Sequence, residues 1–235
     1  MAVPLRRWNL KSADNMRDLG GYACEGGATK YGKLLRSDHM AKITEEEKDF
    51  LIRKGLTDII DLRSKAENAE FPNPFADCPK VKLHDFSAPM DIGSLSDFNC
   101  MGESYIKRFD CYQSYYVDII DAIINSSGMV IFHCTAGKDR TGSVAALILL
   151  SLGVDERDVI ADYEVSHTFL KHQAAKVMDQ YSHFPAHTWR SDPSNMEMTV
   201  AHLDDKYGGA LGYLKSRGFS DTQYAKLREC MVEWE

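Results

Sequence analysis

One short segment of this chain constrains its fold more than any other. Residues 129–132 read Met-Val-Ile-Phe, and they are followed by a polar loop at 134–140 and an apolar helix at 141–152. A continuous apolar run of this kind is typical of a strand that is buried on both faces of a parallel sheet. The order of strand, loop and helix therefore predicts a sheet with helices packed against it.

The rest of the chain continues this alternation. Residues 56–62 are rich in β-branched side chains, and residues 81–86 alternate between apolar and polar positions, so both segments are predicted strands. Between 104 and 125 the apolar residues recur every three or four positions, which predicts one long helix with a buried face. We therefore expect an α/β fold, with a central, mostly parallel sheet flanked by helices and a helical C-terminal part.

Capping boxes predict where two of the helices begin. Thr44 and Glu47 have the spacing in which each side chain bonds the backbone N–H of the other residue, and Ser220 and Gln223 repeat that pattern. The first helix is expected to stop before Gly55, and the last helix is expected to end near Trp234.

Composition and charge exclude several functional classes. The 235 residues are 44% hydrophobic and 27% charged, which is ordinary for a globular protein and consistent with a single domain over 1–235. The net charge of −7 argues against nucleic-acid binding by bulk electrostatics. No run approaches the ~18 apolar residues of a membrane helix, so no transmembrane segment is expected. No signal peptide is visible at the start, so we expect a cytoplasmic location.

The loop after the predicted buried strand combines a cysteine, a glycine and an arginine. A turn from strand to helix gathers backbone N–H groups at the positive end of the helix, which suits a phosphate or another oxyanion. Gly137 permits a tight turn, and Arg140 supplies a planar cation for two phosphate oxygens. We expect these groups to stabilise the thiolate of Cys134, to which Thr141 is placed to donate a hydrogen bond. Cys134 is therefore a candidate nucleophile.

The stretch from His133 to Gly142 resembles the signature loop of cysteine-dependent protein tyrosine and dual-specificity phosphatases. In that loop, His-Cys is followed by five residues, Arg, and then Ser or Thr. The whole chain resembles the bacterial and fungal tyrosine/lipid phosphatase family typified by secreted phosphatases of mycobacteria and Listeria. The supporting blocks are residues 15–21, Arg36-Ser37, residues 61–64, residues 136–142 and the block from Tyr207 to Gly218. The resemblance implies a two-step reaction through a phosphocysteine.

The residues around the candidate nucleophile receive supporting roles. The resemblance implies that His133 orients the loop and tunes the thiolate through backbone hydrogen bonds. Asp61 and Arg63 are expected to form a structural ion pair near the loop, with a direct substrate contact by Arg63 as the alternative. The residues expected to hold the phosphate are Thr135, Ala136, Gly137, Lys138, Asp139 and Arg140.

Two residues of the loop keep alternative roles. The resemblance makes Asp139 the general acid, which protonates the leaving oxygen and then activates water. Asp139 could instead brace the loop amides, and the rival acids are then Asp85, Asp91 and Asp97. Lys138 adds positive charge at the floor of the pocket, which in the family suits inositol rings carrying several phosphates. The alternative is that Lys138 is a solvated side chain that points away from the pocket.

The leading expectation is a protein tyrosine phosphatase acting on phosphotyrosine-containing proteins. Dual specificity and the hydrolysis of phosphoinositides are the alternatives within this class. A phosphopeptide-binding domain without activity and a sulfurtransferase with a similar cysteine loop are the alternatives outside it.

No metal or cofactor is expected for this reaction. The pairs His167 and His172, and His183 and His187, lack the cysteine or carboxylate set that would complete a metal site. By resemblance, residues 163–205 form a helical insertion that could cover the pocket. The alternative is a plain packing subdomain.

Overall fold

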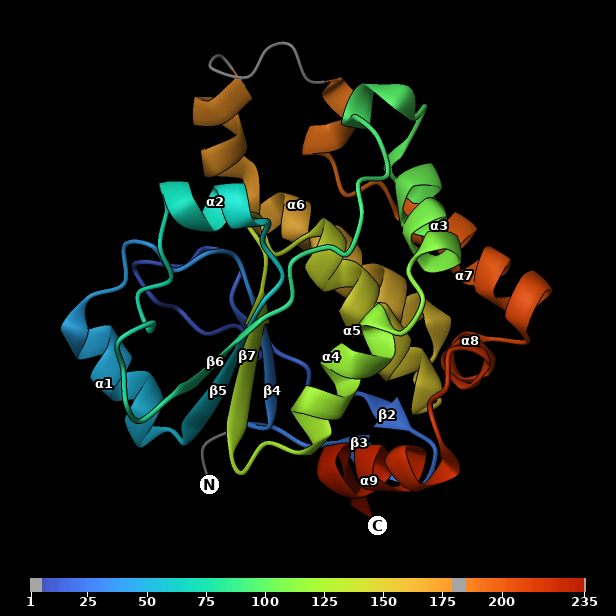
Figure 1. The fold of residues 1–235 in the computed structure, drawn as a ribbon, viewed down its shortest axis with the longest axis horizontal. Coiled ribbons are helices and arrows are strands. Elements are labelled where there is room, and N and C mark those ends of the chain that lie inside the picture. The colour runs from blue at the N-terminus through green and yellow to red at the C-terminus, as the bar shows by residue number, and fades with distance from the viewer. Residues whose placement is uncertain (1–5, 179–184, 235) are drawn as a thin grey trace.

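The computed structural model describes residues 6–178 and 185–234, and its centre is a five-stranded sheet with the order β1-β4-β7-β5-β6 (Figure 1). The strands β4, β7, β5 and β6 are parallel, and β1 pairs with β4 in the antiparallel sense. The strands of this sheet are β1 (Arg17–Asp18), β4 (Leu34–Ser37), β5 (Leu56–Asp61), β6 (Lys82–Asp85) and β7 (Met129–His133). The predicted α/β fold with a mostly parallel sheet is confirmed.

Alternate side chains of the central strands enter two separate hydrophobic clusters, as the two-residue period of a strand requires. Ile59 and Ile131 belong to the cluster that also contains Leu51 of α1 (Glu45–Arg53). Ile60 and Phe132 belong to the larger cluster, which is formed with helices of the second half of the chain. Figure 1 shows α1 on one side of the sheet and α3 to α8 on the other. The sheet is therefore buried on both faces, as the apolar run of β7 predicted.

The other helices, α2 to α9, follow β5 in the chain. α5 packs directly against β4 and β7. The short 3-10 turns are Leu95–Asp97 and Ala186–Trp189. The helices are α2 (Lys65–Glu70), α3 (Met101–Cys111), α4 (Tyr115–Ile124), α5 (Asp139–Ser151), α6 (Glu156–Met178), α7 (Pro193–Tyr207), α8 (Ala210–Ser216) and α9 (Asp221–Met231).

The single long helix predicted between 104 and 125 is wrong, because the chain forms α3 and α4 there with a break between them. Tyr112 ends α3 in an extended conformation, with ψ of 116°. Its ring is only 2% exposed, and its hydroxyl donates to the carbonyl of Met90 at 3.1 Å. Burial of this ring and satisfaction of its hydroxyl favour the bend, although the apolar spacing runs on through it.

The last described residues form a strand, whereas the sequence predicted a helix that ends near Trp234. α9 ends at Met231, and β8 (Val232–Trp234) pairs with β3 (Gly27–Thr29), which in turn pairs with β2 (Ala23–Cys24). This small sheet ties the end of the chain to its beginning. Backbone pairing with a strand more than 200 residues earlier in the chain decides the conformation here, and no local sequence pattern indicates it.

The expected insertion at 163–205 does not begin at an element boundary, because residue 163 lies inside α6. Part of this segment, including His183, lies outside the described residues. Within the residues that the structure describes, no helix is long and apolar enough to cross a membrane.

The register of the sheet brings three distant segments to one edge. Ser37 at the end of β4 and Asp61 at the end of β5 both pair with His133 at the end of β7. Because parallel strands end at the same edge, the residues that follow these strands are neighbours in space. The candidate site lies at this carboxyl edge of the sheet.

Candidate active site

The cysteine loop is a tight turn that only glycine accommodates at one position. Gly137 has φ of +64°, which is in the left-handed region that side chains rarely adopt. A Cβ atom at this position would lie 2.3 Å from the carbonyl oxygen of Ser37. The expected role of Gly137 in the turn therefore rests on both its backbone angle and its close contact with β4.

The carbonyl groups of the loop accept hydrogen bonds from residues outside the loop. The side-chain amide of Asn15 donates to the carbonyls of Ala136 and Gly137, at 2.9 and 3.1 Å. The backbone N–H of His39 donates to the carbonyl of Thr135 at 3.1 Å. Each peptide whose carbonyl is held on one side presents its N–H on the other side, which is the geometry of an anion cradle.

A buried ion cluster supports the same loop from below. Arg36 donates to the carbonyl of Gly137 at 2.8 Å and forms an ion pair with Asp162 of α6. Arg17 donates to the other oxygen of Asp162 at 2.8 Å. Burial alone would raise the pKa of Asp162, but the charges of Arg17 and Arg36 lower it to about 2. Sequence reasoning had no signal for Asp162, since a carboxylate on a helix is usually a surface residue.

Cys134 follows β7 directly and is only 2% exposed. The ring of the preceding His133 is also buried, with its Nδ1 lying 3.2 Å from the carbonyl oxygen of Cys134. Its Nε2 lies 3.0 Å from the side-chain amide of Asn73, so a neutral ring with its proton on Nδ1 satisfies both contacts. Burial lowers the pKa of His133, although the charge of Asp61 opposes the shift.

Asp61 and Arg63 form the expected ion pair at the edge of the loop. Arg63 Nη2 lies 2.7 Å from Asp61 Oδ2, and both side chains are 2% exposed. Burial would raise the pKa of Asp61, but hydrogen bonds from Arg63 and Asn73 and the neighbouring charges lower it to about 2. Arg63 also donates to the carbonyl of Phe71 at 2.8 Å, so its guanidinium is occupied by contacts within the protein.

Arg140 has a carboxylate partner that the sequence reasoning missed. Glu67 of α2 accepts from Arg140 Nη1 at 2.7 Å and from Nη2 at 2.8 Å, which is a two-pronged ion pair. Burial opposes ionisation of Glu67, but these bonds, with one from the Thr135 hydroxyl, hold its pKa well below the usual range. The available signal was the capping box of Ser64 and Glu67 at the start of α2.

Lys138 is buried, so the alternative of a solvated side chain is wrong. It is 2% exposed, and its ammonium donates to the carbonyls of Thr188 at 2.6 Å and Arg190 at 2.8 Å. The ammonium also lies 3.5 Å from Asp139 Oδ1. Burial of an ammonium is costly unless oxygen atoms replace its water, and the turn at 186–190 supplies those oxygens. Lys138 therefore connects the cysteine loop to this turn through its ammonium group.

Thr141 does not form the expected hydrogen bond to the sulfur of Cys134. Its Oγ1 is buried, and it has no hydrogen-bond partner among the residues that the structure describes. Because α5 begins at Asp139, Thr141 lies in its first turn, and the helix sets the direction of its side chain.

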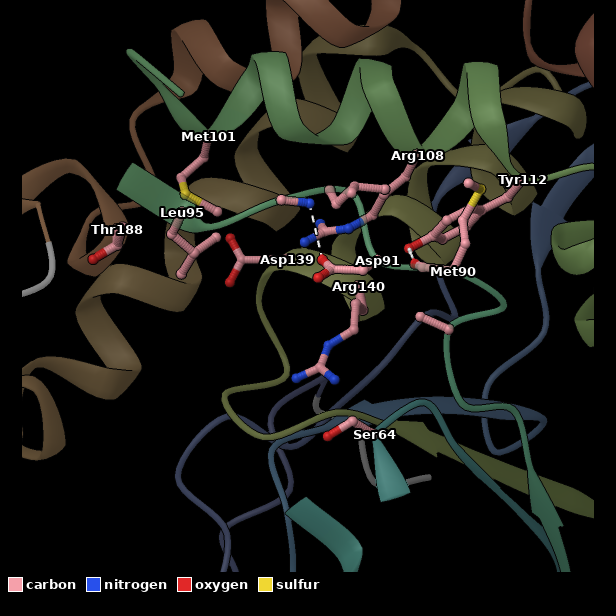
Figure 2. Close-up of a pocket in the computed structure, with 13 residues that line it drawn as sticks. Ser64, Met90, Asp91, Leu95, Met101, Arg108, Tyr112, Asp139, Arg140 and Thr188 are labelled. Carbon is pink, nitrogen blue, oxygen red and sulfur yellow. Dashed lines mark hydrogen bonds between the residues drawn. The ribbon is translucent and has the colours of Figure 1, made fainter. Parts of the chain in front are cut away.

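A cavity of about 410 Å³ is lined by Asp139 and Arg140, and Cys134 is not among its lining residues. Figure 2 shows Arg140 extending from α5 toward Ser64, while Met90, Asp91 and Leu95 line the cavity from the 88–101 segment. Of the rival acids, only Asp91 lines this cavity together with Asp139. Arg108 of α3 also lines it, which sequence reasoning missed because Arg108 lies far from the cysteine loop in the chain.

The described residues contain no group of three or more His, Cys, Asp or Glu side chains that could hold a metal ion. The pair of His167 and His172 on α6 is accordingly without a third ligand there. His183, expected to pair with His187, lies outside the described residues.

A cysteine directly after the central strand, an arginine six residues later and a mostly parallel α/β sheet together define a cysteine-dependent phosphatase. Residues 8–233 match the sequence model of the tyrosine phosphatase family, and the chain belongs to this family. It is a protein-tyrosine phosphatase, a hydrolase of phosphoric monoesters.

Two curated relatives agree with this assignment. A tyrosine-protein phosphatase of Nostoc commune is 28% identical over 228 residues, which cover 88% of this chain and 76% of the relative. A triple specificity protein phosphatase of Mycobacterium tuberculosis is 26% identical and covers 95% of this chain and 98% of the relative. Among solved structures, TpbA of P. aeruginosa in complex with phosphotyrosine has a TM-score of 0.37 and 13% identity, over 76% of this chain and 91% of that one.

Proposed function

We propose that the chain hydrolyses phosphotyrosine in proteins through a phosphocysteine on Cys134. The thiolate sulfur attacks phosphorus, so that an S–P bond forms and the bond from phosphorus to the tyrosyl oxygen breaks. Water then attacks phosphorus, which releases inorganic phosphate and restores the thiolate. The observation that carries this proposal is the hydrogen bonding of the loop. Its carbonyls at 135–138 accept from residues outside the 134–140 loop, and we assign its backbone N–H groups to the phosphate.

Arg140 is the proposed ligand of two phosphate oxygens. Its guanidinium forms a two-pronged pair with Glu67 and also donates to the carbonyl of Leu62 at 3.1 Å. These contacts fix the plane of the guanidinium before substrate arrives, which reduces the ordering that binding requires. Glu67 is therefore a positioning residue for Arg140.

Replacement of Glu67 by glutamine should reduce kcat/KM for p-nitrophenyl phosphate by about 10- to 100-fold, because a misplaced phosphate ligand is costly. The pKa of Glu67 lies below its usual range, so the pair stays charged at neutral and mildly acidic pH, and the defect should appear throughout that range. Glu70→Gln is the matched control, since Glu70 lies on the same helix and is exposed. A kcat/KM of the Glu67→Gln protein equal to that of the parent, measured by steady-state kinetics, would contradict this role.

Asp139 is the proposed general acid, and it then becomes the base that activates water. It lines the same cavity as its neighbour Arg140. Asp85 accepts a bond from Ser87, and Asp97 caps the turn at 95–97, so neither is directed to the cavity by its contacts. Asp91 lines the cavity but is exposed and bonded to Gly93, and it remains the rival.

The cavity supports an aromatic phosphate ester as the substrate. Asp139 and Arg140 line it together with apolar side chains, which are those of Met90, Leu95, Met101 and Tyr112. Such a lining favours the flat ring of phosphotyrosine over the short alkyl chain of phosphoserine. Thr188, from the segment expected to cover the pocket, lines the same cavity, which supports a covering role for that segment.

A substrate panel tests this proposal. Phosphotyrosine peptides should be hydrolysed with kcat/KM at least about tenfold above phosphoserine and phosphothreonine peptides and phosphoinositides, because the aromatic ring gains contacts that the others lack. Phosphate release at matched concentrations is the measurement. Greater turnover of phosphoinositides would establish the lipid alternative.

Two controls separate the other classes of protein. Sulfur transfer from thiosulfate to cyanide should be absent, and its presence would establish a sulfurtransferase. Binding of phosphotyrosine peptide without hydrolysis would establish a phosphopeptide-binding domain.

A further inference from the structure

The carboxylate of Asp139 is held by a buried tyrosine from another helix. The hydroxyl of Tyr105 on α3 donates to Asp139 Oδ1. The same hydroxyl oxygen lies 2.9 Å from the hydroxyl of Tyr163 on α6. The two tyrosines are 0% and 1% exposed. The contacts therefore form a chain of hydroxyl groups that leads from the core to the candidate acid.

The direction of the hydrogen bonds in this chain follows from the available protons. Burial, followed by the negative charge of Asp139, raises the pKa of Tyr105 well above its ordinary value, so its hydroxyl stays protonated. Burial raises the pKa of Tyr163 as well. Since the single proton of Tyr105 is given to Asp139, Tyr163 must donate to Tyr105. Donation in one direction polarises each hydroxyl and strengthens the last bond to the carboxylate.

The bond from Tyr105 divides the two oxygens of Asp139 between two tasks. Oδ1 accepts from Tyr105 and lies 3.5 Å from the ammonium of Lys138. Oδ2 has no hydrogen bond within the part of the chain that the structure describes, and Asp139 lines the cavity. A proton carried on Oδ2 is thus free of competing acceptors and can be given to a leaving oxygen.

We propose that Tyr105 is a positioning residue of the phosphatase reaction, which holds Asp139 Oδ1 so that Oδ2 serves the leaving group, and that Tyr163 supports it. This inference rests on the proposed role of Asp139 as the acid. It assigns a function to a tyrosine whose ring otherwise belongs to the hydrophobic core. The groups that face Asp139 from the elements around it are Tyr105 and Arg108 of α3, Tyr163 of α6, Asp91 of the 88–101 segment, and Lys138 and Arg140 of its own loop.

Tyr105→Phe tests the inference, since it removes the hydroxyl and keeps the ring. With phenyl phosphate, whose leaving oxygen must be protonated, kcat should fall about tenfold, while p-nitrophenyl phosphate should change by about twofold at most. The basic limb of the pH–rate profile should move to higher pH, because the ionised carboxylate loses a hydrogen bond that favours it. Tyr163→Phe should produce a smaller shift in the same direction, since the direct donor remains.

Tyr116→Phe is the control for loss of a core hydroxyl. Tyr116 is 2% exposed and packs against Phe109 and Tyr213, away from Asp139. It should leave both the leaving-group dependence and the pH profile unchanged. Were Tyr105→Phe to lower the activity on both esters equally and leave the pH profile in place, Tyr105 would be a core residue only. If Tyr105→Phe failed to fold, Tyr163→Phe would test the inference instead. A shift of its basic limb to higher pH would support the role of Tyr105, and an unchanged pH profile would contradict it.

The Asp139→Asn variant separates this inference from the proposed acid. If Asp139→Asn shows no leaving-group dependence, the acid assignment itself fails. If Asp139→Asn shows that dependence and Tyr105→Phe does not, only the role of Tyr105 fails. In the double variant, adding Tyr105→Phe to Asp139→Asn should cost about twofold or less, because residues that act through one another are not additive.

Discussion

Replacement of Cys134 by serine is expected to abolish turnover of p-nitrophenyl phosphate, with kcat lowered by about 10³-fold or more. A serine hydroxyl does not ionise near neutral pH, so the loop would hold phosphate without a nucleophile to attack it. The two side chains are similar in shape, and Cys134 is buried with 2% exposure. The fold should therefore survive, and steady-state kinetics with a thermal melt would measure both properties.

Cys78→Ser is a suitable control for this experiment. Cys78 is a free, partly buried cysteine that packs against the hydrophobic cluster around α1, away from the loop. Its replacement should leave kcat within about twofold of the parent, as is usual for partly exposed sites outside the chemistry. Activity of Cys134→Ser within about tenfold of the parent would refute the phosphocysteine mechanism.

Asp139→Asn is expected to slow hydrolysis most for esters with poor leaving groups. A tyrosyl or phenyl oxygen must be protonated as it departs, so kcat for phenyl phosphate should fall by about 10²-fold or more. Nitrophenolate leaves with less help, and its ester should be affected less. The basic limb of the pH–rate profile should flatten, since that limb reports loss of the proton of the acid. The amide oxygen of asparagine can still accept from Tyr105, so the side chain keeps its position.

Asp91→Asn is the matched comparison, because Asp91 lines the same cavity. It should leave the dependence on the leaving group as in the parent. If Asp91→Asn instead produced that dependence, and Asp139→Asn slowed all esters equally while weakening phosphate affinity, Asp91 would be the acid. Asp139 would then be a brace of the loop.

Local elements of this protein could be predicted because their causes lie within a few residues. Thr44 and Glu47 close a capping box that starts α1, and Ser220 does the same for α9. The apolar run at 129–132 became the central strand β7, since such a run can be buried only between two covered faces. The break at Tyr112 and the strand β8 were missed, because contacts with distant residues decide both conformations.

The candidate site also contains residues that local sequence predicts and residues that only distant contacts place. Cys134, Asp139 and Arg140 are neighbours in the sequence, and their spacing alone predicts that they share one loop. Glu67 lies 73 residues from Arg140, Tyr105 lies 34 residues from Asp139, and Asp162 lies 126 residues from Arg36, through which it acts on the loop. Nothing local to these three indicates a partner, because a glutamate, an aspartate or a tyrosine on a helix is satisfied in many other ways.

The sequence by itself determined the class of chemistry, since a thiol, glycine and arginine at this spacing on a strand–loop–helix turn can cradle and attack an oxyanion. Only the tertiary structure decided how those groups are held. Parallel pairing of β4, β7 and β5 brings their carboxyl ends to one edge, and the packing of α2, α3 and α6 against it then supplies the partners of Arg140, Asp139 and Arg36. These contacts depend on long-range burial, because a charged pair or a buried hydroxyl is stable there only when both partners arrive together.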